Sequence, residues 1–204
     1  MTGLPYLIGL TGNIATGKSE VGRILSRLGA RVIDADRVAH EVMEPQGPAY
    51  GPVVEAFGTG ILAGDGSIDR AKLGQIVFRD AAALRRLEAA VHPATIAEVG
   101  QRITHSREPV VVVEAIKLIE AGMHRLYNEL WVVTAPRSLQ IERLVESRGL
   151  SEAEAALRVD AQPPQEEKVR VADRVFVNDG TLAELEDKVR AAWAEILQGL
   201  EPIV

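Results

Sequence analysis

The sequence contains no cysteine, so it can form neither a disulfide framework nor a metal site with thiolate ligands. Aromatic residues make up only 4% of the chain, and a hydrophobic core must therefore rest on Val, Leu, Ile and Ala. No apolar run is long enough to span a bilayer. The chain also does not open with the basic region, apolar stretch and cleavage site of a signal peptide. We therefore expect a cytoplasmic protein that makes no membrane contact.

An excess of positive charge is absent as well. The formal net charge is −6 and the pI is about 5.3, the opposite of what general binding to a nucleic-acid backbone requires. We therefore expect no nucleic-acid partner, and any anionic ligand must be held by a local site. With 204 residues, 47% of them hydrophobic and 25% charged, the chain is long enough for one sizeable core, or for one core with a small inserted lobe.

Short aliphatic runs recur along the chain and predict β-strands. They occupy residues 6–10, 31–33, 110–113, 130–133 and 174–177. None alternates strictly between polar and apolar residues, which is typical of strands buried on both faces of a parallel sheet. Amphipathic helical patterns lie between them, and capping boxes at 151–154 and 181–184 mark two helix starts. We therefore predict an open α/β fold with a parallel five-stranded sheet covered by helices.

Two segments interrupt this alternation. Residues 37–105 are mostly helical in pattern, and we interpret them as a lobe over the sheet that takes an acceptor substrate. Residues 147–171 are charged and carry Pro163-Pro164, and either a mobile lid or a solvated helical hairpin fits this composition. The core of a single domain then comprises about 1–36, 106–146 and 172–204.

The strongest local signal follows the first predicted strand. Residues 12–19 match the pattern G-x-x-x-x-G-K-[ST] between a buried strand and an amphipathic helix. They are Gly12, Asn13, Ile14, Ala15, Thr16, Gly17, Lys18 and Ser19. Glycines let backbone N–H groups turn around phosphate oxygens, and the helix N-terminus adds partial positive charge. Lys18 can reach the β- and γ-phosphates, and the Ser19 hydroxyl can ligate Mg²⁺. The motif predicts a site for a nucleoside triphosphate or a similar polyphosphate.

Acidic residues follow two of the predicted strands. Asp34 and Asp36 come after residues 31–33, and Glu114 comes after residues 110–113. The carboxyl ends of parallel strands face the ligand crevice, and alternate residues of an extended chain share a side. Asp36 is either a general base that takes a proton from an attacking hydroxyl or a helix N-cap. Glu114 is either an acid that organises Mg²⁺ or a charge exposed to water at the strand end.

Several later polar residues have both a structural and a functional interpretation. Pro93 can start a helix at its first position, which favours a structural role for His92. Arg143 and Arg148 are either solvated surface residues or cations that neutralise a transferring phosphoryl group. Asn178 follows the last predicted strand and either contacts a base or initiates a turn. The Asn-Lys-x-Asp element that reads guanine is absent, which argues against GTP as the nucleotide.

Together these stretches resemble the dephospho-coenzyme A kinase family over nearly the full length of the chain. The matching segments are IGLTGNIATGKS, GARVIDADRVAHEV, FG with DGSIDR and LGQIVF, LEAAVHP, Gln140 with Arg143 and Arg148, and AQPPQEEKVRVADRVFVNDG. The resemblance implies a nucleoside-monophosphate-kinase-like P-loop fold with a helical substrate lobe and a lid. It also implies ATP- and Mg²⁺-dependent phosphorylation of the ribose 3′-hydroxyl of dephospho-coenzyme A, the last step of coenzyme A biosynthesis. ATP and dephospho-coenzyme A are then the expected partners of a monomer or weak homo-oligomer.

The resemblance further implies roles for individual residues. Asp36 is the expected general base, with Lys18 as the second catalytic residue and Ser19 as the metal ligand. The expected ATP-binding residues are 12–19 with Glu20, then Arg143 and Asn178, the latter near the adenine, while Arg148 falls in the lid. The expected acceptor-binding residues are Asp34, Asp36, Arg70, His92 and Glu114.

The sequence departs from the family pattern in two places. The cradle commonly reads GGIGSGKST, and we interpret Asn13, Ala15, Thr16 and Glu20 as tolerable variation around the residues that carry the chemistry. After the third predicted strand, the acidic-x-Pro-Leu-Leu segment reads EAIKL at residues 114–118, which places a lysine near the expected phosphates. Two other functions remain open: a kinase for another small molecule or nucleoside, and a nucleotide-dependent switch that changes partners on hydrolysis.

Overall fold

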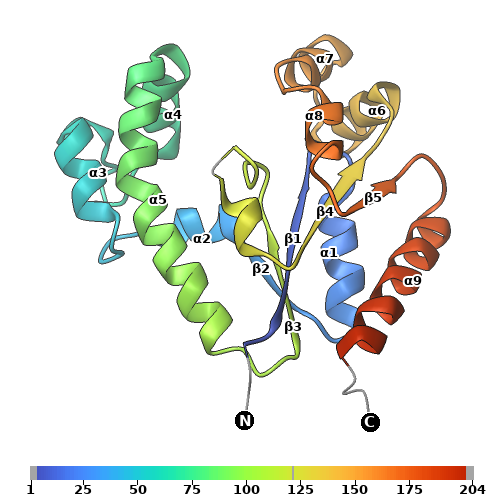
Figure 1. Cartoon of the computed structure of the whole chain (residues 1–204). Helices are drawn as coiled ribbons and strands as arrows, with labels where there is room; N and C mark the ends of the chain where they lie inside the picture. Colours follow the sequence, from blue (N-terminus) through green and yellow to red (C-terminus); the bar gives the residue numbers. More distant parts are fainter. Residues whose placement is uncertain (1–3, 121, 201–204) are drawn as a thin grey trace. The chain divides into compact units, whose positions relative to one another are not determined.

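The computed structural model describes residues 4–120 and 122–200 and contains one five-stranded sheet (Figure 1). The strands are β1 (Tyr6–Gly12), β2 (Arg31–Asp34), β3 (Val110–Glu114), β4 (Glu129–Thr134) and β5 (Arg174–Val177). Their order across the sheet is β2-β3-β1-β4-β5. β1 pairs in parallel with β3 and with β4, and β5 pairs in parallel with β4. All five predicted strands are therefore confirmed, as is the parallel α/β fold.

The core of the sheet is aliphatic, as the composition requires. Every residue of β3 is buried, so its unbroken valine run faces protein on both sides. α1 (Lys18–Arg27) and α9 (Leu182–Leu200) lie against each other and pack on β1, β4 and β5 (Figure 1). α1 contributes Val21, Ile24 and Leu25 to this core, and α9 contributes Leu185, Val189, Trp193 and Ile196. The sheet thereby becomes a rigid base for the loops at its carboxyl ends.

Three helices follow β4 in the same part of the chain: α6 (Arg137–Arg148), α7 (Glu152–Asp160) and α8 (Gln165–Val169). They gather near the ends of β1 and β4 (Figure 1). The capping box predicted at Ser151 is present, because its hydroxyl accepts from the Glu154 N–H and the Glu154 carboxylate accepts from the Ser151 N–H. Thr181 and Glu184 make the same pair of bonds before α9. A 3₁₀ turn, η2 (Met123–Leu126), precedes β4.

The chain divides into two compact units, of which the second is Asp34–His105 and the first is the rest of the described chain. The second unit is helical: α2 (Ala35–Glu41), α3 (Tyr50–Phe57), the 3₁₀ turn η1 (Thr59–Ile61), α4 (Arg70–Arg79) and α5 (Ala81–Thr104). α2, α3 and α4 all pack against α5, which is thus the scaffold of this unit. The role of the unit in substrate binding stays a prediction.

The position of Pro93 differs from the one predicted from the sequence. Pro93 does not start a helix but lies inside α5, which runs without a break from Ala81 to Thr104. Proline has no N–H for the carbonyl four residues earlier, and that loss normally breaks a helix. Here packing of α2, α3 and α4 along α5 holds the helix together through the proline. His92 is therefore a mid-helix residue, and its side chain is exposed.

Within residues 4–120 and 122–200, no helix combines the length and the apolar composition that a bilayer crossing requires.

Candidate active site

The predicted phosphate cradle lies between β1 and α1. Gly17 precedes α1 with a φ of 95°, in the left-handed region that favours glycine. A β-carbon there would also overlap the Asn178 side-chain amide. A β-carbon on Gly12 would lie 2.5 Å from the Val133 carbonyl oxygen. Both pattern glycines are thus required by the shape of the loop, which leads directly into the positive end of α1.

Three side chains meet at the start of α1. Lys18 Nζ lies 2.6 Å from Glu114 Oε1, and Ser19 Oγ donates to the same oxygen at 2.6 Å. Lys18 and Glu114 are both buried, with 9% and 5% of their surfaces exposed. The alternative of a water-exposed charge at the end of β3 is therefore wrong for Glu114. Buried opposite charges at this separation stabilise each other, whereas either one alone would be costly.

Gly22 is a site residue that the sequence analysis missed. It lies on the buried face of α1, and a β-carbon there would approach Glu114 Oε2 to 2.8 Å. Gly22 thus makes the room in which the Glu114 carboxylate reaches Lys18 and Ser19. A glycine inside a helix lowers the stability of the helix by about 1 kcal/mol relative to alanine. A glycine within the helix predicted after the cradle was therefore the sequence feature that could have identified Gly22.

Asn178 and Arg143 hold the cradle from outside. The Asn178 side-chain N–H donates to the Thr16 carbonyl at 2.8 Å. Arg143 donates to the carbonyls of Ala15 at 3.3 Å and Asn178 at 3.1 Å. Neither residue is simply a solvated surface group or a turn former, because each satisfies backbone oxygens of the loop. The structure thus brings together Thr16, Arg143 and Asn178, and contact of Asn178 with a base stays a prediction.

The segment 162–168, which we call the lid base, was also missed as a support of the cradle. Asn13 donates from its side chain to the Pro163 carbonyl at 2.9 Å. The Ile14 N–H donates to Gln162 Oε1, also at 2.9 Å. Gln165 exchanges two hydrogen bonds with the backbone of Ala135, at 3.1 and 3.0 Å. The lid base is therefore tied to the cradle and to the end of β4.

Lys168 completes this attachment. Its side chain is buried with 3% of the residue exposed, and its ammonium donates to the Ile116 carbonyl at 3.1 Å and to Glu120 at 2.7 Å. The lid base therefore also binds the segment that follows β3. Residues 163, 164, 166 and 167 are exposed, so the side-chain contacts of this segment run through Gln162, Gln165 and Lys168, and its role as a lid stays a prediction. In the sequence, the side-chain amides and the lysine beside Pro163-Pro164 were the features that could have indicated these contacts.

A groove of about 360 Å³ lies beside the cradle. Ala15 and Gly17 form one wall, and α6 forms the other through Arg143, Leu144 and Arg148 among others. Arg148 is exposed, so its guanidinium is accessible to a ligand in this groove. Arg143 and Arg148 thus line one groove at the edge of the cradle.

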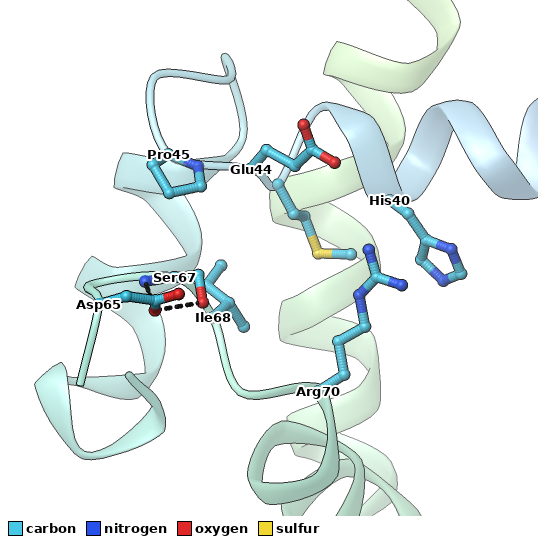
Figure 2. Close-up of a pocket in the computed structure, with 8 residues that line it drawn as sticks. His40, Glu44, Pro45, Asp65, Ser67, Ile68 and Arg70 are labelled. Atoms are coloured by element: carbon cyan, nitrogen blue, oxygen red, sulfur yellow. Dashed lines mark hydrogen bonds between the residues drawn. The ribbon is translucent and has the colours of Figure 1, made fainter. Parts of the chain in front are cut away.

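The other predicted site residues belong to the unit Asp34–His105. The N-cap of α2 is Asp34, whose carboxylate accepts from the Arg37 N–H at 3.0 Å, and the assignment of this cap to Asp36 is wrong. Asp36 lies in the first helical turn and is half-buried. The chain is already helical at Asp36, so the extended backbone on which a shared side for Asp34 and Asp36 depended is absent there. Arg70 starts α4 and lines a cavity with His40 (Figure 2), whereas His92 does not line it.

A parallel sheet with a glycine-rich phosphate cradle between its central strand and the first helix defines the class of P-loop kinases. A crystal structure of shikimate kinase from Bacteroides thetaiotaomicron shares this fold, with a TM-score of 0.52 at 18% identity over 95% of this chain and 98% of that one. The sequence model of the dephospho-CoA kinase family matches residues 6–184. The chain belongs to the dephospho-CoA kinase family.

Individual relatives agree with this assignment. The dephospho-CoA kinase of Geobacter sulfurreducens is 48% identical over 192 residues, which cover 93% of this chain and 98% of that protein. The solved structure of TT1252 from Thermus thermophilus has a TM-score of 0.83 at 33% identity, covering 95% of this chain and 98% of that one. The dephospho-CoA kinase from Campylobacter jejuni has a TM-score of 0.62 at 25% identity and the same coverage.

Proposed function

We propose that this chain transfers the γ-phosphoryl group of ATP to the ribose 3′-hydroxyl of dephospho-coenzyme A and releases coenzyme A and ADP. The assignment of ATP as phosphoryl donor rests on one observation. At the start of α1, Lys18 and Ser19 both bind the carboxylate of Glu114. The acceptor half rests on membership of the dephospho-CoA kinase family.

The cradle residues bind and orient the donor. Backbone N–H groups at the start of α1 point outward from the positive end of the helix, where phosphate oxygens can accept from them. Lys18 supplies the compensating cation for the β- and γ-phosphates. In phosphoryl transfer, positioning and neutralisation of charge contribute most of the rate enhancement. The fixed loop, braced by Asn178 and Arg143, provides that positioning.

The oxygen atoms at the cradle fit Mg²⁺. A hydroxyl on Ser19 and a carboxylate on Glu114 lie side by side, and Mg²⁺ prefers oxygen ligands. Among residues 4–120 and 122–200, no group of three or more His, Asp or Glu residues gathers as a closed metal cage. Such sparse protein ligation suits Mg²⁺, which usually keeps waters and substrate phosphates as its other ligands. When bound, Mg²⁺ neutralises charge on the β- and γ-phosphates.

The groove beside the cradle is where we place the nucleoside of ATP. It borders Gly17, so a nucleotide whose phosphates occupy the cradle can extend into it without a break. Arg143 and Arg148 line it and offer guanidinium planes that can stack on a purine. Asn178 does not line this groove; its side-chain N–H binds the Thr16 carbonyl, and its contact with the adenine stays a prediction.

Asp36 is the proposed general base. The 3′-hydroxyl oxygen attacks the γ-phosphorus, a new O–P bond forms, and the bond between the γ-phosphorus and the bridging oxygen of ADP breaks. The proton of the hydroxyl passes to the Asp36 carboxylate. Asp36 lies in the first turn of α2, at the end of that helix where backbone N–H groups are free of helical partners. Asp34, Arg70 and His92 remain the proposed acceptor-binding residues, whereas the contacts of Glu114 with Lys18 and Ser19 favour a role for it at the donor site.

The test is a direct assay of product. The purified chain is incubated with ATP, Mg²⁺ and dephospho-coenzyme A, and coenzyme A is measured by mass spectrometry, with adenosine and nucleoside monophosphates as competing acceptors. We expect coenzyme A as the main product, and we expect Lys18→Ala to lose most of the turnover. Preferential phosphorylation of another acceptor, or hydrolysis of ATP with no acceptor requirement, would overturn the proposal.

A further inference from the structure

The proposed general base, Asp36, lies on a helix that is too short to be stable alone. α2 spans seven residues, and isolated helices of this length do not form in water, so its orientation depends on what it packs against. Its buried residues are Ala35 and Val38, and the helix packs on α5. Apolar contact is non-directional and leaves a helix free to turn slightly about its axis. Whatever fixes the rotation of α2 therefore also fixes Asp36.

A charged contact joins α2 to α5. Arg102, in the last turn of α5, donates from Nη2 to Glu41 Oε2 at 2.6 Å and from Nε to Glu98 Oε1 at 2.8 Å. Glu41 Oε1 also accepts from the side chain of Arg37 at 2.9 Å. The bonds to Glu98 and from Arg37 each join residues four apart within one helix. Of these three bonds, the one between Arg102 and Glu41 crosses between helices, over 61 positions of the sequence.

This contact constrains orientation more than it adds stability. The Arg102 and Glu41 side chains are 33% and 30% exposed, and ion pairs that solvent reaches contribute little to the free energy of unfolding. The hydrogen bond from Arg102 is the main cause that lowers the pKa of Glu41, so the pair is charged at neutral pH. A charge-assisted bond from a planar guanidinium fixes direction as well as distance. The end of α2 is therefore held at a defined angle.

Asp36 and Glu41 lie on opposite sides of the buried face of α2. Successive helical residues are about 100° apart, so the buried Ala35, Val38 and Val42 span an arc of about 60°. Asp36 lies about 100° beyond one edge of this arc and Glu41 about 60° beyond the other. A rotation of α2 that opens the bond to Arg102 thus turns Asp36 by the same angle. A turn of about 10° moves a side chain at the rim of a helix by about 1 Å.

We propose that Arg102 and Glu41 are positioning residues for phosphoryl transfer, whose bond fixes the rotation of α2 and holds the Asp36 carboxylate at the acceptor hydroxyl. A general base must lie about 2.6–3.2 Å from the oxygen whose proton it takes, and a displacement of about 1 Å can cost a factor of about 100 in rate. Loss of the bond therefore lowers kcat, whereas the contacts that bind the two substrates stay in place. The inference rests on the proposed function, in which Asp36 is the general base.

The experiment measures kcat and both KM values in Arg102→Gln, in Glu41→Gln and in the double variant. Arg102→Lys is the conservative variant, because it keeps the charge but loses the planar set of donors. Glu98→Gln and Arg37→Gln are matched controls, because each removes a bond of the same network that stays within one helix. Arg102→Gln is also combined with Asp36→Asn. Circular dichroism and thermal unfolding show whether each variant is folded.

We expect Arg102→Gln and Glu41→Gln each to lower kcat about 10-fold while both KM values stay within about twofold. Because both residues act through one bond, the double variant loses no more than either single variant. Arg102→Lys recovers part of the rate, the two controls behave like the unaltered chain, and Tm falls by about 2–4 °C at most. In the Asp36→Asn background, Arg102→Gln causes almost no further loss.

Unchanged kcat in Arg102→Gln, or an equal loss in Glu98→Gln, would overturn the inference. So would a full further loss in the Asp36→Asn background, because Arg102 would then act by a route other than Asp36. If the chain phosphorylates a different acceptor, the proposed function is wrong, and the same variants assayed with that acceptor still test the positioning role. A chain that transfers no phosphoryl group to any acceptor overturns both.

Discussion

Lys18 and Glu114 form a buried ion pair, in which the lysine Nζ lies 2.6 Å from the carboxylate Oε1. Ser19 donates to the same oxygen, so one carboxylate holds both cradle side chains that the nucleotide needs. Lys18 and Ser19 therefore have fixed positions at the mouth of the cradle. In the proposed function, Glu114 therefore positions the donor site and also offers an oxygen ligand suited to Mg²⁺.

We expect Glu114→Gln to lower kcat about 10-fold or more and to raise the Mg²⁺ concentration required for half-maximal rate. The amide keeps one hydrogen-bond acceptor for Lys18 but loses the negative charge that balances the ammonium. Because Lys18 is buried, we also expect this loss to lower the free energy of unfolding by about 1–3 kcal/mol. Glu114→Asp keeps the charge on a shorter side chain and should recover part of the rate. Magnesium titrations of activity and chemical denaturation measure the two effects.

Glu186→Gln is the control for this variant, because Glu186 pairs with Arg27 and Arg190 on the surface of the same unit. Exposed pairs contribute at most about 1 kcal/mol, so stability and the Mg²⁺ requirement should be nearly unchanged. A Glu114→Gln protein with the same Mg²⁺ requirement as the unaltered chain would contradict the role given to Glu114.

A second prediction concerns Asn178, whose side-chain N–H binds the Thr16 carbonyl. Asn178→Ala leaves that carbonyl buried without this donor, and we expect the KM for ATP to rise about 10-fold, in line with a penalty of about 1–3 kcal/mol. Asn178→Asp should be worse than alanine, because a carboxylate repels the carbonyl oxygen it faces. Steady-state kinetics with ATP as the varied substrate test this order, and an aspartate variant better than alanine would contradict it.

The central strands β1, β3 and β4 could be predicted because their continuous aliphatic runs are buried on both faces of the sheet. The edge strands β2 and β5 are only partly buried, although their aliphatic runs also predicted strands. The cradle could be predicted because its glycines, Lys18 and Ser19 are adjacent in the sequence. The ion pair of Lys18 and Glu114 joins residues 96 positions apart, and no local pattern encodes such a contact. Glu114 was nevertheless identified by its place at the end of β3, although its partners were not.

The contacts of the lid base could not be predicted from the sequence. Asn13 and Ile14 bind residues 150 and 148 positions away through a side-chain amide and a backbone N–H. Such bonds leave no periodicity in the sequence, so Asn13 was interpreted as neutral variation. Pro93 was misplaced for a related reason, since tertiary packing along α5 outweighs the local preference of proline. Local residue propensity therefore determines secondary structure where a segment has few packing neighbours, and tertiary packing determines it where a segment has many.

The third prediction tests the general base. We expect Asp36→Asn to leave ATP binding nearly intact and to lower kcat about 100-fold or more, which is the scale of general-base catalysis. Asp80→Asn is the control, because Asp80 caps α5 and asparagine caps a helix equally well. Product formation at saturating ATP and dephospho-coenzyme A measures the loss. Unchanged turnover in the Asp36 variant would remove Asp36 from this role.

The fourth prediction concerns acid stability. Burial raises the pKa of Glu129, but hydrogen bonds from Arg174 and Trp131 lower it by more, so the net pKa lies below 4.5. A carboxyl with a lowered pKa in the folded state contributes stability above its unfolded pKa and loses it as pH falls through the folded value. We expect Glu129→Gln to lower Tm at pH 7 and to flatten the decline of Tm below about pH 4.5. Thermal unfolding from pH 7 to pH 3 measures this, and parallel curves for both proteins would contradict it.

The last prediction tests whether the lid base supports the cradle. Gln162→Ala removes the acceptor of the Ile14 N–H, and Asn13→Gly removes the bond to the Pro163 carbonyl. Each loss removes one of the two hydrogen bonds that hold the start of the cradle loop. We therefore expect the KM for ATP to rise about 3- to 10-fold while kcat changes less. The double variant should lose less than the sum of the two, because both bonds fasten the same two segments. Gln165→Ala, which releases only Ala135, should leave the KM for ATP unchanged and serves as the control. A double variant whose losses simply add would show that Asn13 and Gln162 act independently on the cradle.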